Sequence, residues 1–350
     1  MSTNPHFDGI SIVVTYYNER LFLEKCVKAI SNALKNLEPQ KQQAVEIIIM
    51  DDASECPPGK MPDEGNFRVV RLPENGGVGE ARNAGIRLSR YNYIHFLDVD
   101  VYICEKFLKI LFQRLDTNPP ICAIQGYYSE IPGNEHPTWF NWYMSLSWYH
   151  NNSFVLAGNE KGLAYFVNSG CITFRKDYFL SIGGYRNYAS SGGEEYEILS
   201  RMKTGDLKHD SSLINYHNCD FFYQRAKKVW RRGSNYWSTV AKNEKIPSEF
   251  KSTCGVRAIS SVSASMGLAV SPFSPLGGAI IFILATIGGI LGDRGEVYFM
   301  VKKGGVFFGL TAILFRQTEY TIVSLSVGCA FIIALRDVVF QKARQFLESF

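Results

Sequence analysis

Two carboxylates at the end of an apolar run are the first residues in this chain that could do chemistry. Residues 93–97, Tyr-Ile-His-Phe-Leu, lead directly into Asp98-Val99-Asp100. Such a run predicts a buried strand, and parallel strands present ligand-binding residues at their carboxyl ends. An extended Asp-x-Asp places both carboxylates on one side, where they can hold a divalent cation that binds a diphosphate. The alternative is an ordinary turn, because Asp is common in turns.

A second acidic pair follows another apolar run. Residues 45–50, Val-Glu-Ile-Ile-Ile-Met, precede Asp51 and Asp52. If neighbouring strands end in these two pairs, the crevice between them is strongly anionic. That arrangement is costly unless a cation or hydrogen-bond donors occupy it.

The glycine-rich segment Asn75-Gly76-Gly77-Val78-Gly79 predicts a turn that opens a helix over 80–89. It lacks the Gly-x-Gly-x-x-Gly order and does not follow the first strand, so it is a poor dinucleotide-binding loop. Arg82, just inside the helix, is a better candidate for contact with a ligand. An Arg in this position is also commonly solvated.

Three further candidates lie later in the chain. Gly170 could let a substrate approach the backbone closely, or it could belong to an ordinary turn before a strand. Glu194 and Glu195 follow two glycines at the start of a predicted helix, where carboxylates are also common caps. His217 follows a strand-like segment, and an isolated His is more often structural than a ligand.

Alternating strands and helices must position these residues, which predicts an α/β fold with a mainly parallel sheet. The predicted strands are 11–15, 45–50, 67–72, 93–97, 121–127, 172–174 and 212–216. One helix is predicted with an apolar face made of Leu23, Cys26, Val27, Ile30 and Leu34. Further helices are predicted at 80–89, near 106–115 and after residue 193.

Composition narrows the function classes. The 350 residues are 46% hydrophobic with a net charge of +4, and no long basic block indicates a nucleic-acid partner. The eight cysteines have no Cys-x-x-Cys spacing and are typical of reduced thiols, and no signal peptide is expected before the first strand.

The chain changes character near residue 250, which predicts a catalytic domain over 1–250 and a membrane-associated helical region over 251–350. Residues 275–292 are an uncharged apolar run of about the minimum length for a membrane helix, and 321–335 is a shorter one. Two or three spanning or re-entrant segments fit, with membrane lipids as partners; a buried helical hairpin is the alternative. The basic flanks favour a cell-membrane location with the catalytic domain in the cytoplasm: Lys302, Lys303, Arg336, Lys342 and Arg344.

An ordered series of motifs over about residues 10–235 resembles the family 2 glycosyltransferases, which have a GT-A fold. The series comprises Val-Thr-Tyr-Tyr-Asn-Glu at 14–19, Ile-Met-Asp-Asp-Ala-Ser at 49–54, Asn-Gly-Gly at 75–77, Ala-Arg-Asn-Ala-Gly at 81–85, Phe-Leu-Asp-Val-Asp at 96–100, Gly-Gly-Tyr at 183–185, Gly-Gly-Glu-Glu at 192–195 and His217.

The resemblance implies an inverting transfer of one sugar from a nucleotide sugar, with UDP favoured by family frequency, to a glycan or lipid-linked acceptor. It implies that Mn²⁺ or Mg²⁺ is held by Asp98, Asp100 and His217. The general base would be Glu195 or Glu194, where the family has Glu-Asp. The implied donor-binding residues are Thr15, Tyr17, Glu19, Asp51, Asp52, Arg82, Asp98 and Gly170.

Three other functions stay open. Processive synthases of the family carry Gln-x-x-Arg-Trp, whereas Gln224 and Trp230 here have different spacing, so transfer of a single sugar is favoured. A non-catalytic binding module with the GT-A shape is the second alternative. A nucleotidyltransferase is the third, and the Gly-Gly-Glu-Glu element and His217 fit it poorly.

Overall fold

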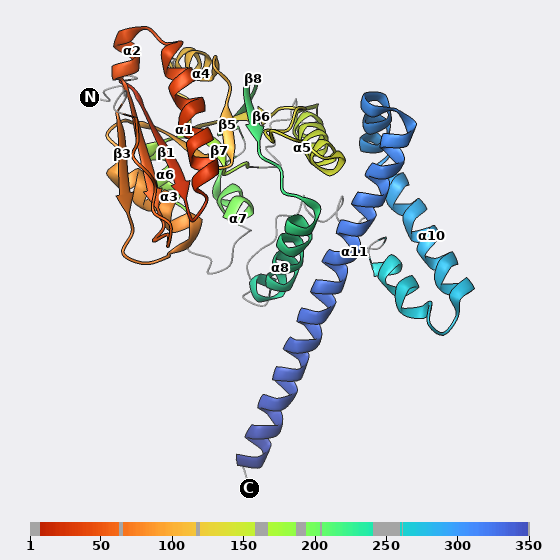
Figure 1. The fold of residues 1–350 in the computed structure, drawn as a ribbon. Coiled ribbons are helices and arrows are strands. Elements are labelled where there is room, and N and C mark those ends of the chain that lie inside the picture. Colours follow the sequence, from red (N-terminus) through yellow and green to blue (C-terminus); the bar gives the residue numbers. More distant parts are fainter. Residues whose placement is uncertain are drawn as a thin grey trace. The chain divides into compact units, whose positions relative to one another are not determined.

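The computed structural model describes residues 8–62, 66–116, 120–157, 167–186, 194–203, 205–240, 260 and 262–348 (Figure 1). The chain divides into two compact units, Met1–Cys219 and Asp220–Phe350. This division comes earlier than the predicted boundary at 250. Residues 241–259 lie outside the described residues, so the predicted domain limits stay a prediction.

The N-terminal unit is built on one mixed sheet of eight strands in the order β3-β2-β1-β4-β7-β6-β8-β5. Four pairs are parallel (β1–β2, β1–β4, β2–β3, β6–β8), and β7 runs antiparallel to both β4 and β6, as β5 does to β8. The sheet is therefore less uniformly parallel than simple alternation predicts. The strands are β1 Ile10–Tyr16, β2 Val45–Asp51, β3 Phe67–Arg71, β4 Tyr93–Asp98, β5 Val101–Ile103, β6 Ala123–Tyr128, β7 Cys171–Arg175 and β8 Leu207–His217.

Alternating side chains of the central strands supply two hydrophobic cores. Ile12 and Val14 of β1 pack into the core that contains the apolar face of α1, whereas Val13 packs into the core that contains Ala81 and Ala84 of α3. Every residue of β1 and β2 is buried, as expected for strands covered on both faces. The helices of this unit are α1 Arg20–Lys35, α2 Pro39–Gln43, α3 Gly77–Leu88, α4 Phe107–Leu115, α5 Trp139–Ala157, α6 Lys176–Ser181 and α7 Glu194–Arg201.

Register brings the acidic strand ends to one edge of the sheet. Thr15 pairs with Asp98, and Tyr16 pairs with Asp51 on the other side of β1. The chain turns at Val99-Asp100 before β5 begins, so Asp98 and Asp100 are not successive residues of one extended strand. The expectation of an extended Asp-x-Asp is wrong, because the second Asp belongs to a turn.

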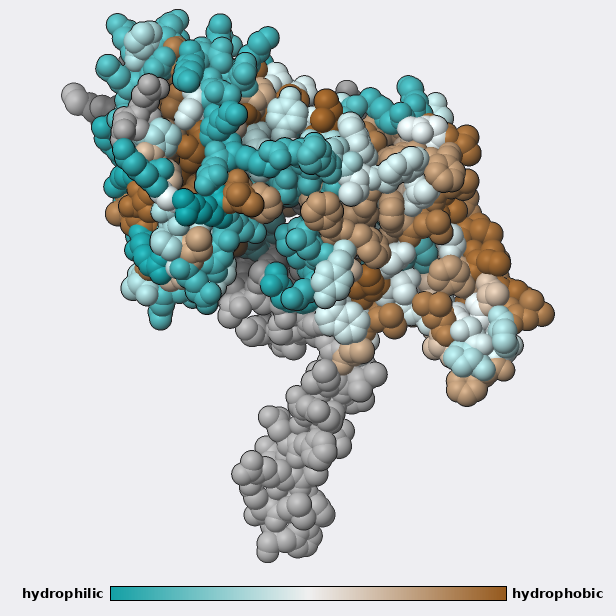
Figure 2. Space-filling model, viewed as in Figure 1, coloured by the Kyte–Doolittle hydropathy of each residue, from teal (hydrophilic) through white to brown (hydrophobic). Residues whose placement is uncertain are grey.

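The C-terminal unit contains α8 Phe222–Val240, α10 Pro275–Gly292 and α11 Arg294–Glu348. Gly305 has φ 81° and ψ 174°, so α11 is two helices joined at a break. Two stretches are long and apolar enough to cross a membrane: α10, with mean hydropathy 2.0, and Arg294–Ser326, with mean hydropathy 1.4. The brown surface in Figure 2 gathers over these helices, and α10 exposes Leu276, Ile280, Ile283, Leu284, Ile287 and Leu291.

The charges that interrupt the apolar run of α11 are paired. Arg316 lies 2.9 Å from Glu296 and 3.3 Å from Asp293, and Arg225 of α8 lies 2.7 Å from Glu319. Polar groups in apolar surroundings need such partners. Arg316 and Glu319 thus lie, with their charges paired, in the part of α11 that follows the break at Gly305.

Candidate active site

Two side chains hold the carboxylate of Asp98 at the strand edge. Its Oδ1 accepts hydrogen bonds from Thr15 Oγ1 at 3.0 Å and from Arg82 Nη2 at 2.7 Å. Burial raises the pKa of Asp98, but the Arg82 charge and the two hydrogen bonds outweigh burial and leave the pKa lowered. Asp98 is therefore held as a carboxylate by the protein itself.

Gly170 gives this carboxylate room. Its carbonyl accepts the backbone N–H of Asp98 at 2.9 Å, and a Cβ at position 170 would lie 2.6 Å from Oδ2 of Asp98. The close approach that the glycine permits is thus to the Asp98 side chain. Contact of Gly170 with a substrate stays a prediction.

Asp51 and Asp52 bind groups of the protein. Asp51 accepts the N–H of Ser54 at 2.9 Å and a hydrogen bond from Arg71 at 2.7 Å. The two oxygens of Asp52 accept the N–H groups of Gly76 and Gly77 at 2.8 and 2.9 Å. Hydrogen-bond donors of the chain therefore offset much of the cost of placing these negative charges close together at the strand ends.

Asp100 meets His217 across the β5–β8 pairing. Oδ2 of Asp100 and Nε2 of His217 are 3.8 Å apart, and the N–H of Asn218 donates to the carbonyl of Asp100 at 2.8 Å. The imidazole packs against Trp148 with ring centroids 4.4 Å apart, and meets Tyr128 edge-on at 5.0 Å. His217 is thus fixed beside the Asp-x-Asp turn.

These residues fit a hard divalent cation by their chemistry. Carboxylate oxygens and an imidazole nitrogen are donors that Mn²⁺ and Mg²⁺ accept. The side chains of Asp98, Asp100 and His217 keep 33%, 20% and 15% of their surface exposed, so a ligand can reach them. Among the described residues no three His, Cys, Asp or Glu side chains already converge as a metal site.

Arg82 is buried, with 2% of its side chain exposed, contrary to the solvated position that is common early in a helix. It also lies 3.7 Å from Glu194 and over the ring of Tyr185, 5.2 Å from the centroid. Burial alone would lower the pKa of Arg82, but Asp98 and Glu194 raise it above its usual value. Arg82 is the cation that balances two carboxylates.

Asn83 joins α3 to the Gly183-Gly184-Tyr185 turn. Its side chain accepts the N–H of Tyr185 at 3.0 Å and donates to the carbonyl of Tyr185 at 2.6 Å. Gly184 has φ +64°, and a Cβ there would lie 2.9 Å from Oδ1 of Asn83. Only glycine suits both the backbone conformation and the contact.

The other predicted residues take distinct positions. The Thr15 hydroxyl orients Asp98, whereas Tyr17 and Glu19 are exposed beyond the end of β1. Glu194 and Glu195 begin α7 and are partly buried. Gly192 and Gly193 lie outside the described residues. The structure brings Arg82, Asp98 and Glu194 together, and separately Asp100 and His217.

Some contributors to the site escape sequence reasoning. Asn18 and Ala53 adopt positive φ values of 58° and 55° after β1 and β2. Asn18 exchanges hydrogen bonds with this second loop, accepting from the N–H of Cys56 and donating its own N–H to Ser54 Oγ, both at 3.0 Å. No sequence pattern around Trp148 predicts that its ring packs against His217.

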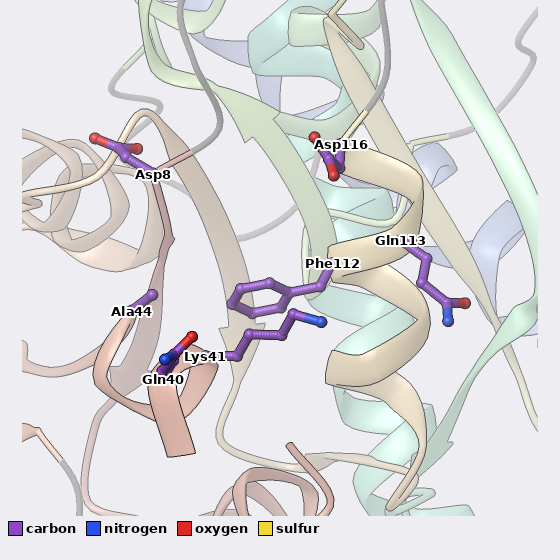
Figure 3. A pocket seen from close by; sticks show the side chains of 7 residues that line it. All are labelled: Asp8, Gln40, Lys41, Ala44, Phe112, Gln113 and Asp116. Atoms are coloured by element: carbon purple, nitrogen blue, oxygen red, sulfur yellow. The ribbon is translucent and has the colours of Figure 1, made fainter. Parts of the chain in front are cut away.

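A pocket elsewhere on the N-terminal unit is not part of this site. Figure 3 shows Asp8, Lys41 and Phe112 among its lining residues, next to the start of β1 and the ends of α2 and α4. The candidate site lies at the opposite, carboxyl ends of β1, β2 and β4.

A known protein family matches most of the part of the chain that carries this site. Residues 11–183 match the model of glycosyl transferase family 2. The chain carries a family 2 glycosyltransferase domain. The resemblance to family 2 glycosyltransferases that the motifs indicate is thus confirmed. The matched range contains the Asp-x-Asp, Arg82 and Asp52.

Two curated relatives are similar over part of this domain. Glycosyltransferase GlyG of Streptococcus pneumoniae is 33% identical over 132 residues, which cover 36% of this chain and 42% of GlyG. Poly-beta-1,6-N-acetyl-D-glucosamine synthase of Staphylococcus aureus is 28% identical over 123 residues, 34% of this chain and 28% of the synthase. The chain spans less than half of the length of these relatives.

A solved structure confirms the fold. The mannosyltransferase PcManGT from Pyrobaculum calidifontis, in complex with GDP-Man and Mn2+, superposes with a TM-score of 0.51 at 13% identity. The match covers 94% of this chain and 87% of PcManGT. The domain therefore has the GT-A-like α/β fold that the motifs predict.

Proposed function

We propose that this protein transfers a single sugar from a nucleotide-diphosphate sugar to an acceptor hydroxyl, with inversion at the anomeric carbon. The observation that carries the proposal is a pair of contacts at the strand edge of a family 2 domain: Asp98 with Arg82, which also lies 3.7 Å from Glu194, and Asp100 with His217. A UDP-sugar is the favoured donor.

The donor's diphosphate would be held at Asp100 and His217, with Asp98 beside them. Mn²⁺ or Mg²⁺ bound by these residues would neutralise charge on the departing diphosphate. Arg82 and Thr15 keep Asp98 ionised and correctly oriented for that purpose. Thr15, Tyr17, Glu19, Asp51, Asp52 and Gly170 remain the proposed surroundings of the donor.

The proton would go to a carboxylate at the start of α7. The acceptor oxygen attacks the anomeric carbon, the bond from that carbon to the diphosphate oxygen breaks, and the hydroxyl proton passes to Glu195 or Glu194. The longer Glu side chain performs the same transfer as the Asp usual in this family. An acceptor that is already ionised would need this base far less.

The acceptor is proposed to be a lipid-linked or cell-surface glycan. Support comes from the two apolar stretches of the C-terminal unit and from the polysaccharide synthase among the relatives. Under this proposal the C-terminal helices lie in the cell membrane, with the catalytic domain on the cytoplasmic side.

The direct experiment measures nucleoside diphosphate released by the detergent-solubilised full chain. A panel of UDP- and GDP-sugars is supplied with Mn²⁺ or Mg²⁺, with and without a membrane lipid extract. Release from one donor that EDTA abolishes would support the proposal. Release of pyrophosphate instead would indicate a nucleotidyltransferase, and no release from any donor would favour a non-catalytic module.

A processive synthase is the second candidate, because one relative is named as a polymer synthase. The same reaction distinguishes the two by product length. One sugar per acceptor supports single transfer, whereas a ladder of products supports polymerisation.

A further inference from the structure

We propose that one face of α5, with Trp148 as its positioning residue, sets the orientation of the His217 imidazole beside Asp100. The role in metal binding rests on the proposed function, whereas the contacts themselves belong to the fold. Three side chains of α5 reach the end of β8 or the chain just after β6: Asn141, Ser145 and Trp148. Their spacing of four and then three residues places them on one face of the helix.

The main chain around His217 is held by the loop that precedes α5. The carbonyl of His217 accepts the N–H of Gly133 at 2.8 Å, and a Cβ at position 133 would lie 2.9 Å from the carbonyl carbon of His217. Asn134 binds both polar groups of the Cys219 backbone. Its Oδ1 accepts the N–H of Cys219 at 2.9 Å, and its Nδ2 donates to the carbonyl of Cys219 at 3.0 Å. This loop therefore fixes the chain at His217 and directly after it.

The first turns of α5 add to this hold. Asn141 is fully buried, and its Nδ2 donates to the same carbonyl of Cys219 at 3.1 Å, while its Oδ1 accepts the N–H of Thr138 at 2.8 Å. One turn later, Ser145 donates to the carbonyl of Ser129, just after β6, at 2.8 Å. The start of α5 is thus tied both to the chain after β6 and to the chain after β8.

The imidazole of His217 is oriented by packing. Imidazoles that bind metals usually donate their second ring N–H to a carboxylate or a carbonyl, which fixes the ring. Nδ1 of His217 is buried and, within the described part of the chain, has no hydrogen-bond partner. The rings of Trp148 and Tyr128 lie against the imidazole, with centroid distances of 4.4 and 5.0 Å. These ring contacts take the place of the usual hydrogen bond and hold Nε2 towards Asp100.

Trp148 is the ring that can be varied with the least disturbance. The hydroxyl of Tyr128 also donates to Asn168 at 2.7 Å, so a change at Tyr128 breaks a second contact. Trp148 lies two turns beyond Asn141, and its position follows from the anchored start of the helix. A smaller aliphatic side chain at position 148 leaves the imidazole free to rotate, which moves Nε2 away from Asp100.

Mn²⁺ titration of the full chain in detergent, followed by electron paramagnetic resonance, tests the role of Trp148. Trp148→Leu should weaken Mn²⁺ binding by about tenfold, and Trp148→Phe, which keeps an aromatic ring, should recover most of that loss. Trp142→Leu is the matched control, because Trp142 is on the same helix and 37% exposed. Mn²⁺ binding by Trp148→Leu that is as tight as in the control would overturn the proposal.

A double variant shows whether Trp148 acts through His217. His217→Ala already removes the proposed ligand, so adding Trp148→Leu to it should weaken Mn²⁺ binding no further. A further loss as large as that caused by Trp148→Leu alone would overturn the proposal, because Trp148 would then act on the site by another route.

The hold on the main chain is tested without a metal, by hydrogen–deuterium exchange of the backbone of 215–219. Asn134→Ala should speed this exchange by about fivefold or more, because it removes both hydrogen bonds to Cys219. Asn36→Ala is the control, since the Asn36 amide is exposed and bonds within its own helix end. Unchanged exchange in Asn134→Ala would overturn the part assigned to the loop.

The proposed function can fail separately from this inference. Mn²⁺ binding that depends on Trp148, in a chain that turns over no donor, would contradict sugar transfer and support the positioning role. Donor turnover that EDTA abolishes, together with Mn²⁺ affinity that Trp148→Leu leaves unchanged, would support sugar transfer and contradict the positioning role.

Discussion

Nε2 of His217 lies 3.8 Å from Oδ2 of Asp100, although the two residues come from distant parts of the chain. Antiparallel pairing of β5 with β8, in which Val101 is opposite His217, creates this proximity. A His after a strand is more often structural, yet here strand pairing places His217 beside the Asp-x-Asp turn. The relationship makes the proposed metal site testable apart from catalysis.

We expect Asp100→Ala and His217→Ala each to weaken Mn²⁺ binding by at least about tenfold, because each removes a proposed ligand. Mn²⁺ titration followed by electron paramagnetic resonance measures this directly on the full chain. Asp116→Ala is the control, since Asp116 lines the pocket away from the site (Figure 3). Equal Mn²⁺ affinity in all three variants would argue against this ligand set.

Gly170→Ala should reduce nucleoside diphosphate release by about tenfold or more, because the added Cβ would lie 2.6 Å from Asp98 Oδ2 and displace that carboxylate. Gly79→Ala is the matched control, as its Cβ would meet only ordinary contacts beyond 3.4 Å. A steady-state comparison of the two variants, with thermal unfolding as a check on folding, decides the point. Full activity in Gly170→Ala would show that the position of Asp98 is not critical.

The buried His95 predicts acid sensitivity of the fold. Burial lowers its pKa from 6.5 to about 3, so the folded chain keeps it neutral while the unfolded chain takes up a proton below pH 6.5. The contribution of His95 to stability is therefore largest above pH 6.5 and falls as the pH drops towards 3, by on the order of 1 kcal/mol between pH 7.5 and 5.5. His209, whose pKa burial lowers to about 4, acts in the same direction.

His95→Gln isolates that contribution. Its unfolding free energy, measured by urea titration in detergent, should depend less steeply on pH between 7.5 and 5.5 than that of the unmodified chain. Identical slopes would mean that the pKa of His95 is the same in the folded and the unfolded chain.

Arg316→Met should destabilise the C-terminal unit by about 3–5 kcal/mol, because Asp293 and Glu296 would be left buried without their cation. Arg294→Met is the matched control, since Arg294 is exposed at the start of the same helix. Thermal unfolding in detergent compares the two variants. Equal melting temperatures would show that the cluster is already solvated.

Local patterns are sufficient to predict much of the fold. Apolar runs locate β1, β2 and β4 within a residue or two, because central strands buried on both faces have continuous hydrophobic sequences. The helix face from Leu23 to Leu34 is buried as periodicity predicts. The short elements α2, β5 and α6 were not predicted, since three to six residues carry little periodic signal.

The burial of Arg82 and the turn after β4 depend on tertiary contacts, which local sequence patterns do not predict. Whether Arg82 is solvated or buried depends on Asp98 and Glu194, which are far from it in the chain. The turn at Val99-Asp100 arises because β5 leaves to pair with β8, and no local pattern encodes that partner. Donor binding by Thr15, Tyr17, Glu19, Asp51, Asp52 and Gly170, and the domain limits, stay predictions.

The most direct test of the central claim is a paired measurement on the unmodified chain and Asp100→Ala. Both are incubated with the active donor, Mn²⁺ and membrane lipid extract, and released nucleoside diphosphate is compared with sugar found in the product. We predict equal amounts of the two from the unmodified chain, and a loss of more than about 100-fold in Asp100→Ala. Undiminished release by Asp100→Ala, or release without sugar in any product, would contradict the proposed transfer at this strand edge.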